Sequence, residues 1–183
     1  AKALAKEMNY RPNPFAMSLR KNAPRIIGVI VPDIVTHFFA SILNGIENMA
    51  IANGYFVIIT TSHESYEHEK RNIENLVNMR VEGIIACLSQ ETTDFSHISA
   101  LKDINMPLIL FDRVCLTDQF SSVIADGAQS AQMATQHLLD NGSERVAFIG
   151  GANHLDIVKR RKHGYLEALR ENRIPIEKES VVC

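Results

Sequence analysis

Apolar runs alternate with segments of helical periodicity along most of the chain. The run from Ile26 to Val31 is continuously apolar, which is typical of a strand buried on both faces. Apolar side chains then recur at helical spacing from Phe38 to Ala50, and again around Ile73, where Glu69 and Glu74 are expected on the solvent side. Further strands are predicted at 55–61, 83–88, 107–111, 122–125, 145–150 and 180–183. Further helices are predicted at 95–104, 127–140 and 155–172.

This alternation, with short turns between the elements, predicts the α/β class and a parallel sheet sandwiched by helices. Such sheets bind their ligands at the carboxyl ends of the strands. Most of the expected ends are polar or rich in glycine, namely Pro32-Asp33, Thr61-Ser62, Ser89-Gln90, Asp112-Arg113, Asp126 and Gly150-Gly151. The pattern therefore predicts a binding crevice along this edge of the sheet.

Formal charge is spread unevenly, although the net charge of the chain is only -2. Residues 1–25 carry a net charge of +5, so the remainder carries -7. A basic arm on an acidic body suggests an anionic partner for the arm, nucleic acid first, although charge alone favours a solvated terminal tail. The three cysteines lie far apart and fit a reducing cytosol, and we expect neither a membrane span nor a signal peptide.

Sequence motifs of catalysis are missing. No G-x-G-x-x-G follows the first strand, and there is no P-loop and no G-x-S-x-G nucleophile elbow. Gly150-Gly151 is a weak phosphate signal, and His63 and His68 are five residues apart, whereas a zinc-binding helix needs a spacing of four. We therefore expect no enzyme, no cofactor and no metal.

The string NYRPNPFAMSLRKNAPRIIGVIVP, residues 9–32, closely resembles a junction found in LacI-family transcription regulators. There, a helix-turn-helix head is joined by a hinge helix to a core shaped like a periplasmic sugar-binding protein. The rest of the chain follows the same family, with RVEGIIA, PLILFDR, HLLDNGSERVAFIGG and RRKHGYLEAL in order. The resemblance covers the whole chain, and its separated signatures agree in order and spacing.

The resemblance implies a role for the basic arm. In such regulators the hinge folds on operator DNA, and the paired hinge helices of a dimer enter the minor groove. By position, Asn13 would face the DNA, Ala16 would lie against the groove floor and Leu19 would wedge between base steps. Arg20 would lie near phosphates. The alternative is an interdomain linker whose Leu19 packs on the body.

The resemblance also implies an effector pocket made by Phe38, Phe39, Asp112, Asp126 and Arg161. The two phenylalanines could both be core, but neighbours on a helix diverge by ~100°, so one of them could instead stack on a ligand ring. Asp112 could accept hydrogen bonds from vicinal hydroxyls or could pair with Arg113. Arg161 could bind a ligand bidentately or belong to a solvated basic turn. Sugars are the commoner effectors, and a sugar phosphate or a purine stays open.

The function implied is a cytoplasmic, homodimeric LacI-type regulator, a repressor first, whose affinity for operator DNA is controlled by a small carbohydrate effector. Residues 1–24 would hold the end of the DNA-binding head and the hinge, 25–126 the N-terminal lobe and 127–183 the first part of the C-terminal lobe. No partner strand and no stop signal follow the last predicted strand, so we expect a longer protein, with the head before Ala1. The alternatives are a solute-binding protein of a transporter with the same core and an enzyme built on this sheet.

Overall fold

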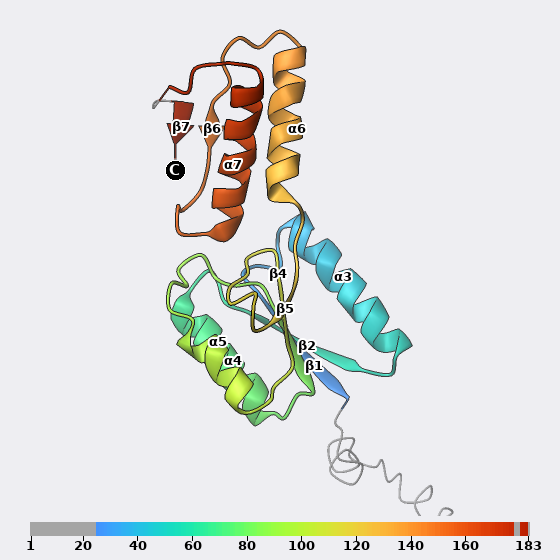
Figure 1. Ribbon diagram of the computed structural model, residues 1–183. Helices are drawn as coiled ribbons and strands as arrows, with labels where there is room; N and C mark the ends of the chain where they lie inside the picture. Colours follow the sequence, from blue (N-terminus) through green and yellow to red (C-terminus); the bar gives the residue numbers. More distant parts are fainter. Residues whose placement is uncertain (1–24, 178–179, 183) are drawn as a thin grey trace, which may run out of the picture.

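The computed structural model describes residues 25–177 and 180–182, which form two lobes (Figure 1). The first lobe is built on five parallel strands in the order β2-β1-β3-β4-β5. These strands are β1 (Ile26–Val31), β2 (Phe56–Thr61), β3 (Gly83–Ala86), β4 (Leu108–Phe111) and β5 (Ser121–Val123). The helices between them are α3 (His37–Ala52), α4 (Tyr66–Asn78) and α5 (Ser96–Asp103).

The alternation of side chains along β1 explains why helices cover both faces of this sheet. Ile26 and Ile30 point to the face covered by α4 and α5, where they join Leu76 in one buried cluster. Val29 and Val31 point to the other face and pack against α3. Gly28 lies opposite α4, because a Cβ there would come within 2.6 Å of the side chain of Leu76. The expected continuous apolar run is thus buried on both sides.

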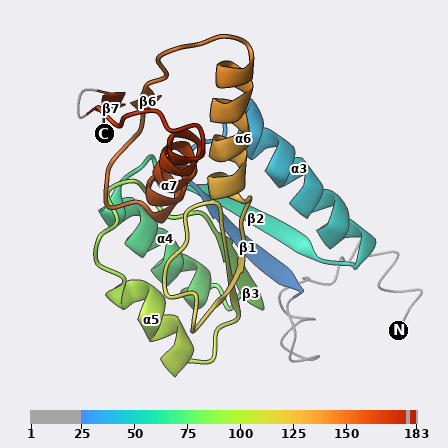
Figure 2. The same cartoon turned by 45° about the horizontal axis from the view of Figure 1, so that its top comes forward.

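The second lobe contains α6 (Gly127–Asp140), β6 (Phe148–Ile149), α7 (Asp156–Glu171) and β7 (Val181–Val182). The two helices lie side by side, as both Figure 1 and Figure 2 show, and β6 pairs with β7 in parallel. Tyr165 of α7 is buried, and its hydroxyl donates a hydrogen bond of 2.8 Å to the carbonyl of Val146. This bond and the adjacent ring of Phe148 tie α7 to the strand β6.

The element order agrees with the sequence pattern, and the α/β class with a parallel sheet is confirmed. The strands are shorter than the apolar runs. The run at 145–150 contributes only Phe148–Ile149, and the run at 122–125 contributes to the edge strand Ser121–Val123. Each of these strands pairs with only one neighbour in the described part of the chain. The backbone hydrogen bonds that define the strand therefore cover fewer residues than the apolar run does.

The expectation that Glu69 lies on the solvent side of its helix is wrong. Glu69 belongs to the first turn of α4 and is fully buried, whereas Glu74 is exposed. The loop that follows β3 and the start of α5 fold over this turn, and they supply hydrogen-bond donors to the carboxyl group. Helical periodicity predicted the wrong environment because a carboxyl group can be buried where donors surround it.

Candidate ligand-binding cleft

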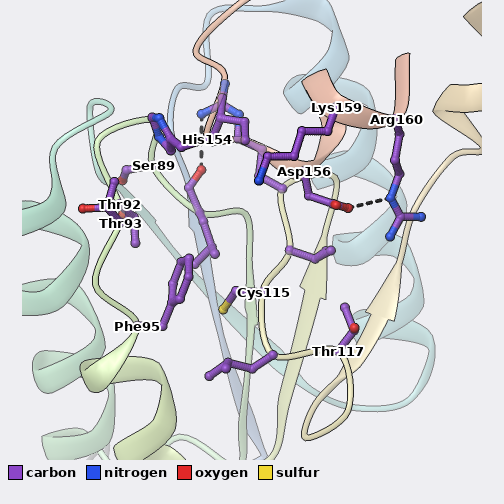
Figure 3. Close-up of a pocket in the computed structure, with 15 residues that line it drawn as sticks. Ser89, Thr92, Thr93, Phe95, Cys115, Thr117, His154, Asp156, Lys159 and Arg160 are labelled. Atoms are coloured by element: carbon purple, nitrogen blue, oxygen red, sulfur yellow. Dashed lines mark hydrogen bonds and ion pairs between the residues drawn. The ribbon is translucent and has the colours of Figure 1, made fainter. Parts of the chain in front are cut away.

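Two neighbouring cavities lie between the carboxyl edge of the first sheet and the start of α7, and Figure 3 shows the residues that line the larger one. The larger has a volume of about 370 Å³ and the smaller about 30 Å³. Both are lined from both lobes, and they share Asp156 and Arg160 of α7. The larger cavity is lined by apolar and by polar side chains. The apolar ones include Leu88, Phe95, Val114, Cys115 and Leu116, and the polar ones include Ser89, Thr92, Thr93, Arg113, Thr117, His154 and Lys159.

The buried carboxyl group of Glu69 holds the loop that forms one wall of the larger cavity. It accepts hydrogen bonds from the backbone N–H of Ser89 at 2.5 Å and from the hydroxyl of Thr92 at 2.9 Å. Nε2 of His97, at 2.8 Å, is its third partner. Ser89 and Thr92 are themselves almost fully buried. Because three donors converge on one acceptor, the conformation of the loop depends on this side chain.

A second glutamate holds the same loop from its exposed side. Glu64 forms a bidentate pair with Arg113, and its Oε2 also accepts the N–H of Gln90 at 2.7 Å. His63 and Glu64, directly after β2, have φ values of 51° and 60°. This left-handed backbone is uncommon for residues other than glycine, and it directs Glu64 back toward Arg113. Burial opposes the charge of Arg113, but the bonds to Glu64 outweigh it and raise its pKa.

One hydrogen bond crosses directly from lobe to lobe beside this cavity. Nε2 of His154, in the loop between β6 and α7, lies 2.8 Å from the backbone carbonyl oxygen of Gln90 (Figure 3). The imidazole N–H is the donor, because a carbonyl can only accept. The cavity is therefore bordered by a polar contact that exists only while the two lobes are close together.

Asp112 stands at the end of β4 and lines the smaller cavity. Its φ is 58°, a strained value of the kind found at ligand sites, although aspartate tolerates it better than most residues. Burial raises the pKa of its carboxyl group, and the charges of Arg113 and Arg161 partly offset this effect. The ion pair with Arg113 considered above is not formed, since that guanidinium pairs with Glu64. The carboxylate is thus left facing the cavity.

Arg161 lines the smaller cavity from α7, and the glycine three residues later explains its position. Gly164 packs against the first turn of α6 so closely that a Cβ would lie 1.9 Å from the carbonyl oxygen of Ala128. The same approach brings the side chain of Arg161 over Gly127. Asp126, the residue directly before Gly127, caps α6 because its side chain accepts a hydrogen bond from the N–H of Gln129 at 3.0 Å. Asp126 is exposed and lines neither cavity.

The two phenylalanines of α3 separate as helical geometry predicts. Phe39 is buried and packs edge-on against Phe111, with ring centroids 6.4 Å apart. Phe38 is 51% exposed. Neither ring lines the two cavities between the lobes. Phe39 is therefore a core residue, and Phe38 is the one whose ring is free to contact a ligand.

Within the described residues, neither the buried cysteines nor the possible metal ligands form a reactive or metal-binding site. Burial raises the pKa of Cys87 and of Cys115 to about 12, so both thiols stay protonated near neutral pH. In the described ranges, no group of three or more His, Cys, Asp or Glu side chains is placed to hold a metal ion. None of the helices described is both long and apolar enough to cross a membrane. The hinge candidates Asn13, Ala16, Leu19 and Arg20 lie outside the described residues.

Sequence reasoning missed most of the residues that line the larger cavity, and also the two glutamates, Glu64 and Glu69, that hold its loop in place. Glu64, Glu69 and His154 lie on loops or on a helix start, where no periodicity marks them. The pair Ser89-Gln90 was noted only as a polar strand end. Lys159 and Arg160 are not singled out by any motif. The sequence does contain one indication of this site. Lys159, Arg160 and Arg161 follow one another near the start of α7, shortly after the pair Gly150-Gly151 that ends a predicted strand.

Known proteins resemble this chain in sequence and in fold. The family described as "Periplasmic binding proteins and sugar binding domain of LacI family" matches residues 25–182. Catabolite control protein A of Priestia megaterium is 33% identical over 180 residues, covering 96% of this chain and 52% of the relative. The ribose operon repressor of Halalkalibacterium halodurans is 29% identical over 169 residues, covering 92% of this chain and 49% of the relative. The chain therefore spans about half the length of these curated relatives.

A solved structure of this group contains a small molecule. The Cra transcriptional dual regulator from Pseudomonas putida, in complex with fructose 1-phosphate, superposes with a TM-score of 0.75 at 27% identity. The match covers 80% of this chain and 54% of that one. By name, these relatives are a control protein, an operon repressor and a transcriptional dual regulator.

Proposed function

The chain belongs to the family of periplasmic binding proteins and LacI-type sugar-binding domains, and on this basis we propose that it is the effector-binding part of a transcription regulator. The regulator is a repressor whose affinity for operator DNA depends on a small carbohydrate effector. The observation that carries this proposal is the cleft, because both of its cavities are lined from both lobes.

Binding in this cleft gives a physical route to control. A ligand that touches Asp112 at the end of β4 and Arg161 on α7 contacts both lobes at once. It therefore favours one relative orientation of the lobes and shifts the population toward it. The free energy by which the ligand shifts this equilibrium equals the difference between its binding free energies for the two orientations. Asp126, which caps α6 where the chain passes into the second lobe, completes the proposed set, and Phe38 is proposed as a stacking surface.

The DNA contact is assigned to the basic arm. Asn13, Ala16, Leu19 and Arg20 are proposed to form a hinge that enters the minor groove of the operator, with Leu19 as the wedge. The domain boundaries at residues 24 and 126 belong to the same proposal. So does the homodimer, because paired hinges and a palindromic site share a two-fold axis. A DNA partner places the protein in the cytoplasm.

The experiment measures operator binding by the full-length protein, with DNA that this protein enriches from a random library. Leu19→Ala removes the wedge and should weaken binding by roughly 10- to 100-fold, because about 1.5–3 kcal/mol of apolar burial is lost. Met17→Ala is the control, since residues two apart in a helix point to different faces. Equal losses in the two variants, or none in Leu19→Ala, would contradict the wedge. Failure of the full-length protein to enrich any DNA would contradict the regulator itself.

A solute-binding protein of a transporter has the same core, and the family description includes that class. The net charge of +5 over residues 1–25 favours the regulator, because a solute-binding protein has no use for a basic arm on an acidic body. The DNA enrichment experiment separates the two classes directly.

A further inference from the structure

The charges that line the proposed effector cleft are unbalanced. Its two cavities are lined by the four cations Arg113, Lys159, Arg160 and Arg161 and by the two carboxylates Asp112 and Asp156. The lining is therefore net positive by two charges, whereas the whole chain carries -2. A cleft of one sign in a body of the other concentrates ligands of opposite charge.

Two of these cations already have carboxylate partners. Arg113 is held bidentately by Glu64, and Nε of Arg160 donates to Asp156 one helical turn away. Lys159 has no ion-pair partner among residues 25–177 and 180–182. Figure 3 shows its side chain extending from α7 toward the larger cavity. Lys159 is therefore the charge in the larger cavity that is available to a ligand.

The remaining polar groups of the larger cavity suit an acidic group better than a neutral sugar. Asp156 is the only carboxylate lining this cavity, and it is already engaged by Arg160, so it is a poor acceptor for sugar hydroxyls. The hydroxyls of Thr93 and Thr117 can donate to a ligand, whereas those of Ser89 and Thr92 already donate to Ser62 and Glu69. Phosphate and carboxylate oxygens accept from hydroxyl and ammonium groups, and charge-assisted bonds of this kind are about twice as strong as neutral ones.

We propose that the effector carries a phosphate or carboxylate group, which binds beside Lys159 in the larger cavity. This inference rests on the proposed function, and it selects an acidic effector over a neutral sugar. The smaller cavity, at about 30 Å³, has room for about one hydroxyl group of the molecule, from which Asp112 accepts a hydrogen bond and to which Arg161 donates one. Lys159 is the residue that determines this specificity.

The test compares acidic compounds with their neutral parents, using the full-length protein and isothermal titration calorimetry. The pairs are ribose 5-phosphate with ribose and glucose 6-phosphate with glucose, with gluconate and inorganic phosphate as further probes. The acidic member of at least one pair should bind ten times more tightly than its parent or better, and its affinity should fall as salt is added. The phosphate esters and gluconate distinguish a phosphate from a carboxylate.

Lys159→Gln should reduce the preference for the acidic member about tenfold, while Lys162→Gln, on the same helix but outside both cavities, should leave it unchanged. Equal affinities for acidic and neutral members would overturn the proposal, as would an unchanged preference in Lys159→Gln. Failure of every acidic probe to bind would also overturn it. Operator binding, measured on the same samples, decides the proposed function separately, because a regulator with a neutral effector would still bind its DNA.

Discussion

His154 in the second lobe donates a hydrogen bond of 2.8 Å to the backbone carbonyl of Gln90 in the first lobe. The N–H of the same Gln90 is held by Glu64, which also holds Arg113 on the rim of the larger cavity. One residue of the loop is thus bound from both lobes. A ligand that moves Arg113 would also displace Glu64, and through Glu64 it would displace Gln90. It would thereby change the contact between Gln90 and His154 that joins the lobes.

Removing His154 should loosen the lobes without unfolding either of them. The contact is exposed, so its net value is about 0.5–1.5 kcal/mol, and losing it should shift the balance between open and closed lobes by up to roughly tenfold. We expect His154→Ala to increase the radius of gyration in small-angle X-ray scattering of the ligand-free protein.

His163→Ala is the matched control, because His163 is an exposed histidine of α7. The melting temperatures of both variants should stay close to that of the wild type. A scattering curve of His154→Ala identical to that of His163→Ala would show that the bond does not set the lobe angle.

Asp112→Asn should stabilise the protein while weakening effector binding. Asparagine adopts the left-handed backbone of this position readily, so the change alters charge rather than conformation. Loss of a charged acceptor should reduce effector affinity by roughly 10- to 100-fold, because hydrogen bonds to charged groups are worth about 1.5–3 kcal/mol. Calorimetric titration measures the affinity, and thermal unfolding measures the stability.

The stability effect of Asp112→Asn should depend on pH in a fixed direction. Burial raises the pKa of Asp112 above its ordinary value of 3.8, so the folded protein binds this proton more tightly than the unfolded chain does. The stability that the protonated form contributes is therefore lost as the pH rises through the folded pKa. The variant should melt higher than the wild type at pH 7, and the difference should close as the pH falls toward 3.8. A difference that widens at low pH would contradict this assignment.

Glu69→Ala should destabilise the first lobe strongly. Removing the carboxyl group leaves the N–H of Ser89, the hydroxyl of Thr92 and the ring of His97 without their shared partner. Breaking a buried polar cluster of this kind costs about 3–5 kcal/mol. Chemical denaturation measures this loss. Glu74→Ala, an exposed glutamate of the same helix, should change stability by about 0.5 kcal/mol or less.

Glu69→Gln tests the role of the same side chain in the cleft if the alanine variant fails to fold. The amide keeps one acceptor oxygen but replaces the other with a donor, so Ser89 and Thr92 compete for a single acceptor. We expect the folded variant to bind the effector more weakly than the wild type does. Wild-type affinity in this variant would show that Glu69 does not position the loop.

Gly164→Ala should disrupt the packing of α7 on α6. The added methyl group would lie 1.9 Å from the carbonyl oxygen of Ala128, so the two helices must move apart. Overpacking of this type costs about 1–3 kcal/mol, and displacement of Arg161 should weaken effector binding as well. Gly45→Ala is the control, since its methyl group meets nothing within 4 Å and should stabilise α3 by about 0.5–1 kcal/mol. Equal effects of the two changes on unfolding would contradict the packing argument.

The local pattern of the chain was sufficient for the order of elements and for part of the candidate site. Strands such as Ile26–Val31 and helices such as Gly127–Asp140 agree with their predicted bounds, because periodicity reports which side chains face a core. Asp112 and Arg161 were found through their motifs, and the structure places both on the smaller cavity. Glu69 was assigned to the wrong environment, since periodicity does not register donors that come from another segment.

The sequence by itself determined the α/β class, the basic arm and the family, because each of these depends on residue types at fixed spacings. Only the tertiary structure decided which residues share the cleft. Lys159 on α7 and Thr92 on a loop of the first lobe are 67 positions apart, yet they line one cavity because the start of α7 in the second lobe faces the carboxyl edge of the first sheet. Hydrogen bonds such as those of Glu69 and His154 join segments with no common pattern, so they exist only once the chain has folded.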